Sequence, residues 1–176
     1  MGNRGGRFHE DRKALGARRF CSRRWIACEC DFRGRRRDVW GKSYTELFFL
    51  DEVTALAAGH RPCFECRRKE AQDFSCAIGD GAPMPADEMD RILDRERRDR
   101  NAKRLHVARL DDLPDGVVIV SEGRALAVRG DALLPWSFRG YGAPVPRPAG
   151  VTISMATPPS IARALHCGYS PRWTSC

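Results

Sequence analysis

Residues 59–67 read Gly-His-Arg-Pro-Cys-Phe-Glu-Cys-Arg, and this stretch decides the fold of the first half of the chain. It contains two cysteines, Cys63 and Cys66, separated by two residues. At the start of a helix this spacing brings two sulfurs within about 3.7 Å, the edge of a tetrahedron with Zn–S bonds of roughly 2.3 Å. In a chain without a secretory signal, such a pair is typical of metal or redox chemistry rather than of a disulfide. We therefore expect Cys63 and Cys66 to bind Zn²⁺, with thiol redox chemistry as a less favoured interpretation.

The remaining zinc ligands must come from elsewhere in the chain. Cys28 and Cys30 lie upstream, and a hairpin followed by a Cys-x-x-Cys helix is the layout of many zinc sites. Residues i and i+2 of a flat strand share a face but lie about 7 Å apart, so both can bind one ion only where the strand curls or ends. The predicted ligands are Cys63, Cys66, Cys28 and Cys30, with His60, His9 or Cys21 left open as a replacement within the upstream pair.

The first part of the chain divides into a basic arm, residues 1–24, and a zinc-binding module, residues 25–78. Within the module we expect strands over residues 25–32, 36–40 and 44–50, the first two forming a hairpin. We expect helices over residues 51–58 and 64–78. Asp51 is an N-cap residue, and Gly59 follows the end of the first helix. The second helix is expected to open with Cys63 and Cys66.

Residues 79–85 are rich in glycine and proline and predict a linker before an α+β part, residues 86–176. A charged helix is expected over residues 86–101, with its arginines and aspartates solvated and paired with one another. Short β-type segments follow, over residues 104–110, 117–120, 125–129, 133–138 and 151–155, and a helix opens at residues 158–160. The sequence thus predicts an α+β fold in which a zinc-stabilised hairpin and helix and a small antiparallel sheet with flanking helices pack as one unit.

The positive charge of the protein is concentrated near its N-terminus. Residues 1–40 hold 12 Arg or Lys against five Asp or Glu, a local excess of +7 out of a total of +8. Clustered positive charge is typical of a polyanion partner, because each phosphate contact releases condensed counterions. We expect nucleic acid as the partner, with DNA favoured over RNA. The plainer alternative is a merely basic surface.

The densest charge lies at the tip of the predicted hairpin. We expect phosphate contacts from Arg33, Arg35, Arg36 and Arg37, beside a glycine that lets the tip approach a backbone closely. Trp25, Phe32 and Trp40 flank this tip. Their spacing fits base stacking and fits burial in a core equally well.

Residues 47–68 resemble the zinc-binding N-terminal domain of Ada, the bacterial alkylation-repair and regulatory protein. The likeness is carried by a short helix that ends in Gly59 and by the motif Arg61-Pro62-Cys63-x-x-Cys66-Arg67. The resemblance implies a zinc module near DNA, with a role in DNA repair or regulation, in which Cys63 and Cys66 match the downstream zinc ligands. Cys28 and Cys30 stand approximately where the upstream pair belongs, with a different spacing.

The motif Pro62-Cys63-x-x-Cys66 is also similar to the downstream signature of zinc nucleobase deaminases. This likeness implies an alternative function, a zinc-dependent hydrolase that acts on a nucleobase or nucleotide. Its zinc would need an open position for water, and Glu29 or Glu65 would have to serve as the base. Whether the protein is an enzyme is left open.

Apolar runs in the sequence are far shorter than the roughly 20 residues of a membrane helix. The N-terminus is basic and leads into charged residues rather than an apolar segment, so it does not resemble a secretory signal. We therefore expect a cytoplasmic protein with no membrane partner. The oligomeric state does not follow from the sequence.

Overall fold

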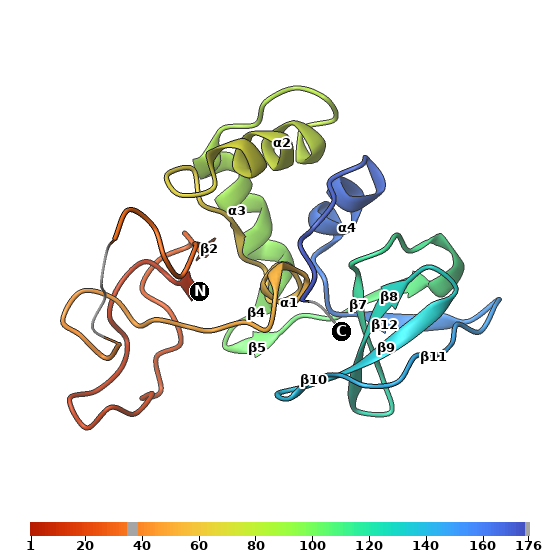
Figure 1. Cartoon of the computed structure of the whole chain (residues 1–176), viewed down its shortest axis with the longest axis horizontal. Coiled ribbons are helices and arrows are strands. Elements are labelled where there is room, and N and C mark those ends of the chain that lie inside the picture. The colour runs from red at the N-terminus through yellow and green to blue at the C-terminus, as the bar shows by residue number, and fades with distance from the viewer. Residues whose placement is uncertain (35–38, 175–176) are drawn as a thin grey trace.

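A computed structural model describes residues 1–34 and 39–174 of the chain. Figure 1 shows an irregular N-terminal segment on one side, an antiparallel sheet on the other, and helices between them. The fold class is α+β, as the sequence predicts, with helices that flank a small antiparallel sheet.

The N-terminal half is organised by three strands of two residues each, β1 (Gly2–Asn3), β2 (Ile26–Ala27) and β3 (Arg61–Pro62). β2 lies in the middle, antiparallel to β1 and parallel to β3. The predicted strand over residues 25–32 is therefore reduced to two residues. In the predicted strand over residues 44–50, only Leu47 forms a bridge, to Gly2. Both predictions were too long because each segment finds a partner backbone over only one or two residues.

The predicted return strand over residues 36–40 includes residues 36–38, which lie outside the described part of the chain. Val39 and Trp40 form a turn. The predicted basic arm, residues 1–24, is mostly irregular, but its first residues are held in β1. The amide of Cys28 donates to the carbonyl of Met1 at 2.7 Å, so the N-terminus lies against the strand that leads to the cysteines.

Helix α1 (Glu52–Ala57) confirms the predicted capping. Asp51 accepts a hydrogen bond from the amide of Thr54 at 2.9 Å, and the Thr54 side chain completes a capping box. Gly59 follows the helix with a φ of +84°. A Cβ at Gly59 would lie 2.6 Å from the side chain of Arg97, so a glycine is required there by both the backbone conformation and the close approach.

Helix α2 (Arg68–Ile78) begins later than predicted, because Cys63 and Cys66 lie in a turn that precedes it. The amide of Arg67 bonds to the carbonyl of Cys63 at 3.0 Å, as in a helix. Arg67 itself adopts φ −135° and ψ 49°, which interrupts the helical path. The two thiols are therefore carried by one closed turn rather than by the first turn of α2.

The C-terminal part contains α3 (Ala86–Arg97), a hairpin of β4 (Arg98–Asp99) and β5 (Ala102–Lys103), and α4 (Pro159–His166). Its main sheet has the order β10-β9-β8-β7-β12-β6, and β11 pairs with β9. The strands are β6 (His106–Arg109), β7 (Val118–Ser121), β8 (Arg124–Arg129), β9 (Ala132–Ser137), β10 (Gly140–Tyr141), β11 (Val145–Pro146) and β12 (Thr152–Met155). A 3-10 turn, Leu110–Asp112, follows β6. All five predicted β segments in this half are confirmed.

Alternate residues of the central strands pack into two apolar clusters. Ile119, Leu126 and Val128 join the larger cluster with residues of α2, α3 and α4. Val118 and Ala127 join a smaller cluster with residues of α1. Because successive side chains of a strand point to opposite faces, β7 and β8 contact helices on both faces of the sheet.

One face of α3 is polar and buried, which corrects the expectation of a solvated, self-paired helix. Asp90 receives two hydrogen bonds from Arg61 of β3, both at 2.9 Å, and both side chains are at most 5% exposed. Arg97 is completely buried and donates to the carbonyls of Gly59 and Arg23. The helical spacing of Asp90, Asp94 and Arg97 aligns them along the N-terminal half, which supplies partners that sequence reasoning did not identify.

Asp90→Asn should destabilise the protein by about 3–5 kcal/mol, because it leaves the buried Arg61 guanidinium without its countercharge. The free energy of unfolding, measured by urea denaturation, checks this.

Asp87→Asn is the matched control on the same helix. Asp87 pairs with Arg24 at 3.2 Å, but its side chain is 66% exposed, so we expect a change below about 1 kcal/mol. Equal effects of the two substitutions would mean that the Arg61–Asp90 pair does not hold α3 to β3.

Candidate metal centre and cationic pocket

Strand register places Cys28 beside Cys63. Ala27 pairs with Pro62 in the parallel β2–β3 ladder, and the amide of Cys63 donates to the carbonyl of Ala27 at 3.0 Å. Each cysteine is the next residue after its paired strand. Two ligands separated by 35 positions in the sequence are therefore neighbours in space.

The turn after β3 adds the third thiol. The Sγ atoms of Cys28, Cys63 and Cys66 all lie within 4.8 Å of one another, and all three residues are partly buried. The amide of Glu29 donates to Cys66 Sγ at 3.3 Å, and the amide of Glu65 donates to Cys63 Sγ at 3.4 Å. Amide donors of this kind stabilise thiolates and orient them toward an ion.

The three thiols have unequal acidities. A hydrogen bond from the Cys28 thiol, with further bonds from the amides of Cys66 and Glu65, lowers the pKa of Cys63 to about 5 against the effect of partial burial. The pKa of Cys28 is raised, because its thiol donates that bond and is itself partly buried. Burial also raises the pKa of Cys66. Cys63 is therefore the first of the three to carry the negative charge that a metal ligand needs.

A cavity of about 20 Å³, which we call the metal cavity, lies among these sulfurs. Cys28, Cys30, Cys63 and Cys66 all line it. This volume suits one water molecule or one ion. Soft thiolate ligands suit zinc, as they also suit copper(I) and iron–sulfur groups. The residues therefore fit a zinc ion, which would supply a fixed link between the β2 and β3 ends.

Cys30 and its alternatives lie outside the three-thiol group in the described chain. Cys30 is exposed, and its Sγ is 3.7 Å from the N-terminal amine of Met1. His60 is fully buried between Trp25 and Phe49, and burial lowers its pKa well below the usual value. His9 bonds to Thr45 at 2.7 Å. Cys21 donates to the carbonyl of Arg7 at 3.0 Å. Of the four, only Cys30 lines the metal cavity.

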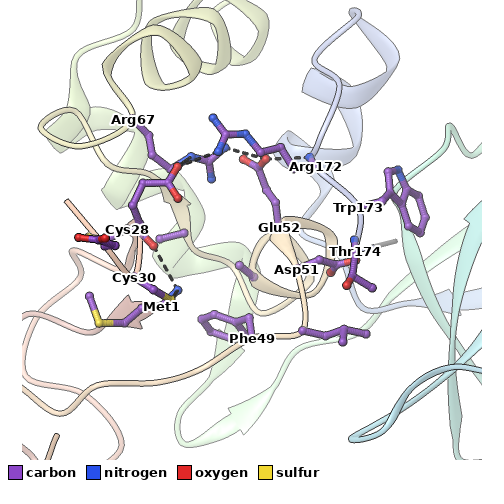
Figure 2. A pocket seen from close by; sticks show the side chains of 15 residues that line it. Met1, Cys28, Cys30, Phe49, Asp51, Glu52, Arg67, Arg172, Trp173 and Thr174 are labelled. Atoms are coloured by element: carbon purple, nitrogen blue, oxygen red, sulfur yellow. Dashed lines mark hydrogen bonds and ion pairs between the residues drawn. The ribbon is translucent and has the colours of Figure 1, made fainter. Parts of the chain in front are cut away.

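A second pocket, which we call the central pocket, adjoins Cys28 and Cys30 and has a volume of about 410 Å³. Figure 2 shows Cys28 and Cys30 on one side, Trp173 on the other, and Glu52 between them. Glu52 accepts a hydrogen bond from Arg67 at 2.8 Å and another from Tyr169 at 2.6 Å. These bonds tie the start of α1 to the turn that carries Cys66 and to the C-terminal segment.

A third pocket, which we call the cationic pocket, has a volume of about 240 Å³ and lies on the side of β2 that is closer to Trp25. Its lining includes six basic residues and, among the described residues, no acidic one; the six are Arg4, Arg19, Arg97, Arg98, Arg100 and Lys103. Asp94 does not line the pocket, but it accepts hydrogen bonds from Arg97 and Arg98, which do. Arg4, Arg19, Arg100 and Lys103 have no acidic partner in the described part of the chain.

The cationic pocket is built around the indole of Trp25. The guanidinium carbons of Arg4 and Arg97 lie 3.8 Å and 4.0 Å from the centre of this ring. Burial lowers the pKa of Arg4 to about 10, with a contribution from Arg19, and burial lowers the pKa of Arg97 to about 10 as well. The Nε atoms of Arg4 and Arg97 are buried and have no hydrogen-bond partner among the described residues.

Lys103 closes one edge of the cationic pocket. Its ammonium donates to the carbonyl of Ala57 at 2.7 Å. Lys103 is an exposed residue, but desolvation of its ammonium, followed by the nearby charges of Arg97 and Arg4, lowers the pKa of Lys103 to about 7. These groups favour an anion, which would balance positive charges that repel one another.

The predicted phosphate-binding cluster is described only in part. Arg33 is exposed, with its guanidinium 5.0 Å from the ring of Phe32, a residue that lines the metal cavity. Arg35, Arg36 and Arg37 lie outside the described residues. Sequence reasoning did not identify Arg4, Arg97 and Lys103 as one group, because they are far apart along the chain. The N-terminal charge excess includes Arg4 and Arg19, but the sequence pattern placed Trp25 beside the predicted hairpin tip and not in this pocket.

Comparisons with protein-family models, with curated proteins and with solved structures found no match to this chain. Among the described residues, no helix combines the length and the apolar character needed to cross a membrane. The Ada resemblance and the deaminase likeness therefore stay predictions.

Cys63→Ser should abolish stoichiometric metal binding, because it removes the most acidic of the three grouped thiols. We expect about one zinc per chain in the unaltered protein and far less than one in the variant, measured by plasma emission spectrometry after dialysis.

Cys167→Ser is the matched control, because Cys167 is exposed on the distant end of α4. It should retain the metal of the unaltered protein. Metal-free unaltered protein, or full retention in Cys63→Ser, would contradict a zinc site at these thiols.

Proposed function

We propose that this chain is a zinc protein that binds nucleic acid, with DNA favoured over RNA. In this proposal Cys28, Cys63 and Cys66 hold structural zinc, with Cys30 as the fourth ligand. The cationic pocket receives a backbone phosphate, and Arg33, Arg35, Arg36 and Arg37 supply the further phosphate contacts that the sequence predicts.

The observation that carries the proposal is the cationic pocket. Four of its basic residues have no carboxylate partner among the described residues, although acidic residues elsewhere in the protein pair readily with arginine. Positive side chains that gather without a countercharge favour a phosphate ligand, and arginine matches phosphate oxygens with two parallel donors. Two of its residues, Arg4 and Arg19, belong to the N-terminal charge excess.

The proposed zinc has a supporting role in binding. The metal cavity and the cationic pocket lie at opposite ends of the β2–β3 pairing, because Cys28 follows β2 and Trp25 precedes it. Fixing Cys28 to Cys63 therefore also fixes Trp25, on which Arg4 and Arg97 stack. Cys30 lines the metal cavity, but its sulfur lies outside the three-thiol group. For Cys30 to bind the ion, the segment after Cys28 has to curl and bring this sulfur closer to the other three.

At pH 6, where Lys103 is charged, Lys103→Gln should weaken binding of a mixed-sequence DNA oligonucleotide about tenfold, because it removes one charge-assisted phosphate contact. The slope of log K against log salt concentration should fall in magnitude by roughly 0.7 to 1. Fluorescence anisotropy across a salt titration measures both quantities.

Arg95→Gln provides a matched charge change at an exposed position of α3 outside the pocket, and its affinity and salt slope should stay close to those of the unaltered protein.

Lys103→Arg tests the pocket through the pH dependence of binding. Lysine with a pKa near 7 loses its charge between pH 6 and 8, so binding should weaken over that range, whereas an arginine keeps its charge and should flatten the profile. Equal effects of Lys103→Gln and Arg95→Gln would contradict the phosphate site.

A zinc-dependent hydrolase is a second candidate, favoured by the central pocket beside Cys28 and by a group of three rather than four thiols. Glu29, a candidate base together with Glu65, accepts a hydrogen bond from Arg172 at 2.8 Å and lies 3.5 Å from Arg67, so two cations already engage it. Cobalt substitution separates the two functions, because four thiolates and three thiolates with a water give different visible spectra.

A further inference from the structure

A large apolar groove continues from the cationic pocket. It has a volume of about 690 Å³, and Ala58 and Lys103 line both this groove and the cationic pocket. The ammonium of Lys103 is held at this junction by the carbonyl of Ala57, a further residue of the groove. The two sites therefore form one continuous surface, charged at one end and apolar at the other.

The groove presents aromatic side chains from two separate parts of the chain. Phe48 comes from the segment before α1 and is 60% exposed, and Phe138 comes from the β9–β10 turn and is 96% exposed. Trp136 lies next to Phe138, with ring centres 4.9 Å apart in an edge-to-face arrangement. We call this surface, lined by Phe48, Trp136 and Phe138, the aromatic groove.

Phe48 and Phe138 are exposed, whereas Trp136 is partly buried. Phe74 and Ile78 show that the protein buries large apolar side chains completely elsewhere. The indole Nε1 of Trp136 is also buried without a hydrogen-bond partner among the described residues. Flat aromatic faces beside an unpartnered donor suit a ligand that is itself flat, aromatic and rich in hydrogen-bond acceptors, as nucleobases are.

We propose that the protein binds single-stranded nucleic acid, with a backbone phosphate in the cationic pocket and unpaired bases stacked in the aromatic groove. This inference rests on the proposed function and names the class of nucleic acid. Charge complementarity with the adjoining pocket selects a phosphate-bearing ligand over an uncharged apolar one. Stacking selects unpaired bases, because a duplex presents base edges and covers base faces.

The volume of the groove supports this assignment. About 690 Å³ lies within the range of pockets that enclose an organic ligand. Lys103 at the junction is placed between the phosphate and the first base. A strand that crosses this junction would contact Lys103 through its backbone and Phe138 through a base.

The test uses the full metal-loaded chain and fluorescence anisotropy with a labelled ten-nucleotide DNA strand of mixed sequence and its matched duplex. The single strand should bind at least tenfold more tightly than the duplex. Phe138→Ala should weaken single-strand binding about tenfold to a hundredfold and leave the salt slope unchanged, because it removes stacking without a phosphate contact. Phe138 is nearly fully exposed, so its truncation should leave folding intact.

Val107→Ala is the matched control, because Val107 is an apolar residue 82% exposed on β6 and lies outside the aromatic groove. It should bind like the unaltered protein. Tryptophan fluorescence gives a second readout. Single-strand binding should quench it, and Trp136→Phe should remove most of that quench.

Duplex binding as tight as single-strand binding, or unaltered single-strand affinity in Phe138→Ala, would overturn the single-strand inference and leave nucleic-acid binding standing if Lys103→Gln still weakens it. Failure of both DNA forms to bind would overturn the proposed function as well. Saturable binding of an apolar dye in the groove that the single strand does not displace would assign the aromatic groove to a different ligand.

Discussion

The parallel pairing of β2 with β3 is the constraint on which both candidate sites depend. At one end the amide of Cys63 bonds to the carbonyl of Ala27, which sets Cys28 beside Cys63. At the other end the amide of Arg61 bonds to the carbonyl of Trp25, which sets the indole below Arg4 and Arg97. A shift of register by one residue would separate the thiols and move Trp25 away from the arginines.

So short a pairing needs support beyond its own hydrogen bonds, because isolated strand pairs are marginal in water. The surrounding structure supplies it through buried charge. Arg61 is held by Asp90 of α3, and Arg97 of the same helix bonds to the carbonyl of Gly59 just before β3. Hydrogen bonds from α3 thus hold β3 in place, and the three thiols lie just past the ends of β2 and β3. A metal at the thiols would link the two strand ends, since its ligands follow both strands.

The sequence predicted best those features that depend on neighbours along the chain. The Asp51 N-cap, the five β segments of the second half and the Cys63–Cys66 pair all follow from local patterns, and the structure brings the predicted ligand Cys28 to that pair. It predicted poorly the features that depend on distant partners. Strands of two residues leave no alternation to detect. The buried face of α3 resembles a solvated helix until Arg61, Gly59 and Arg23 are placed against it.

The burial of Arg97 removes hydration from a charged group and fixes its positive charge at the cationic pocket, where it suits an anionic ligand. An arginine with no exposed surface loses its hydration, and Asp94 and two carbonyls replace only part of that loss. The remaining positive field extends into the pocket, where Arg4 and Lys103 add to it and no described carboxylate lines the wall. A rigid guanidinium held against Trp25 keeps positive charge at a fixed place before an anion arrives, so little ordering remains to be done on binding.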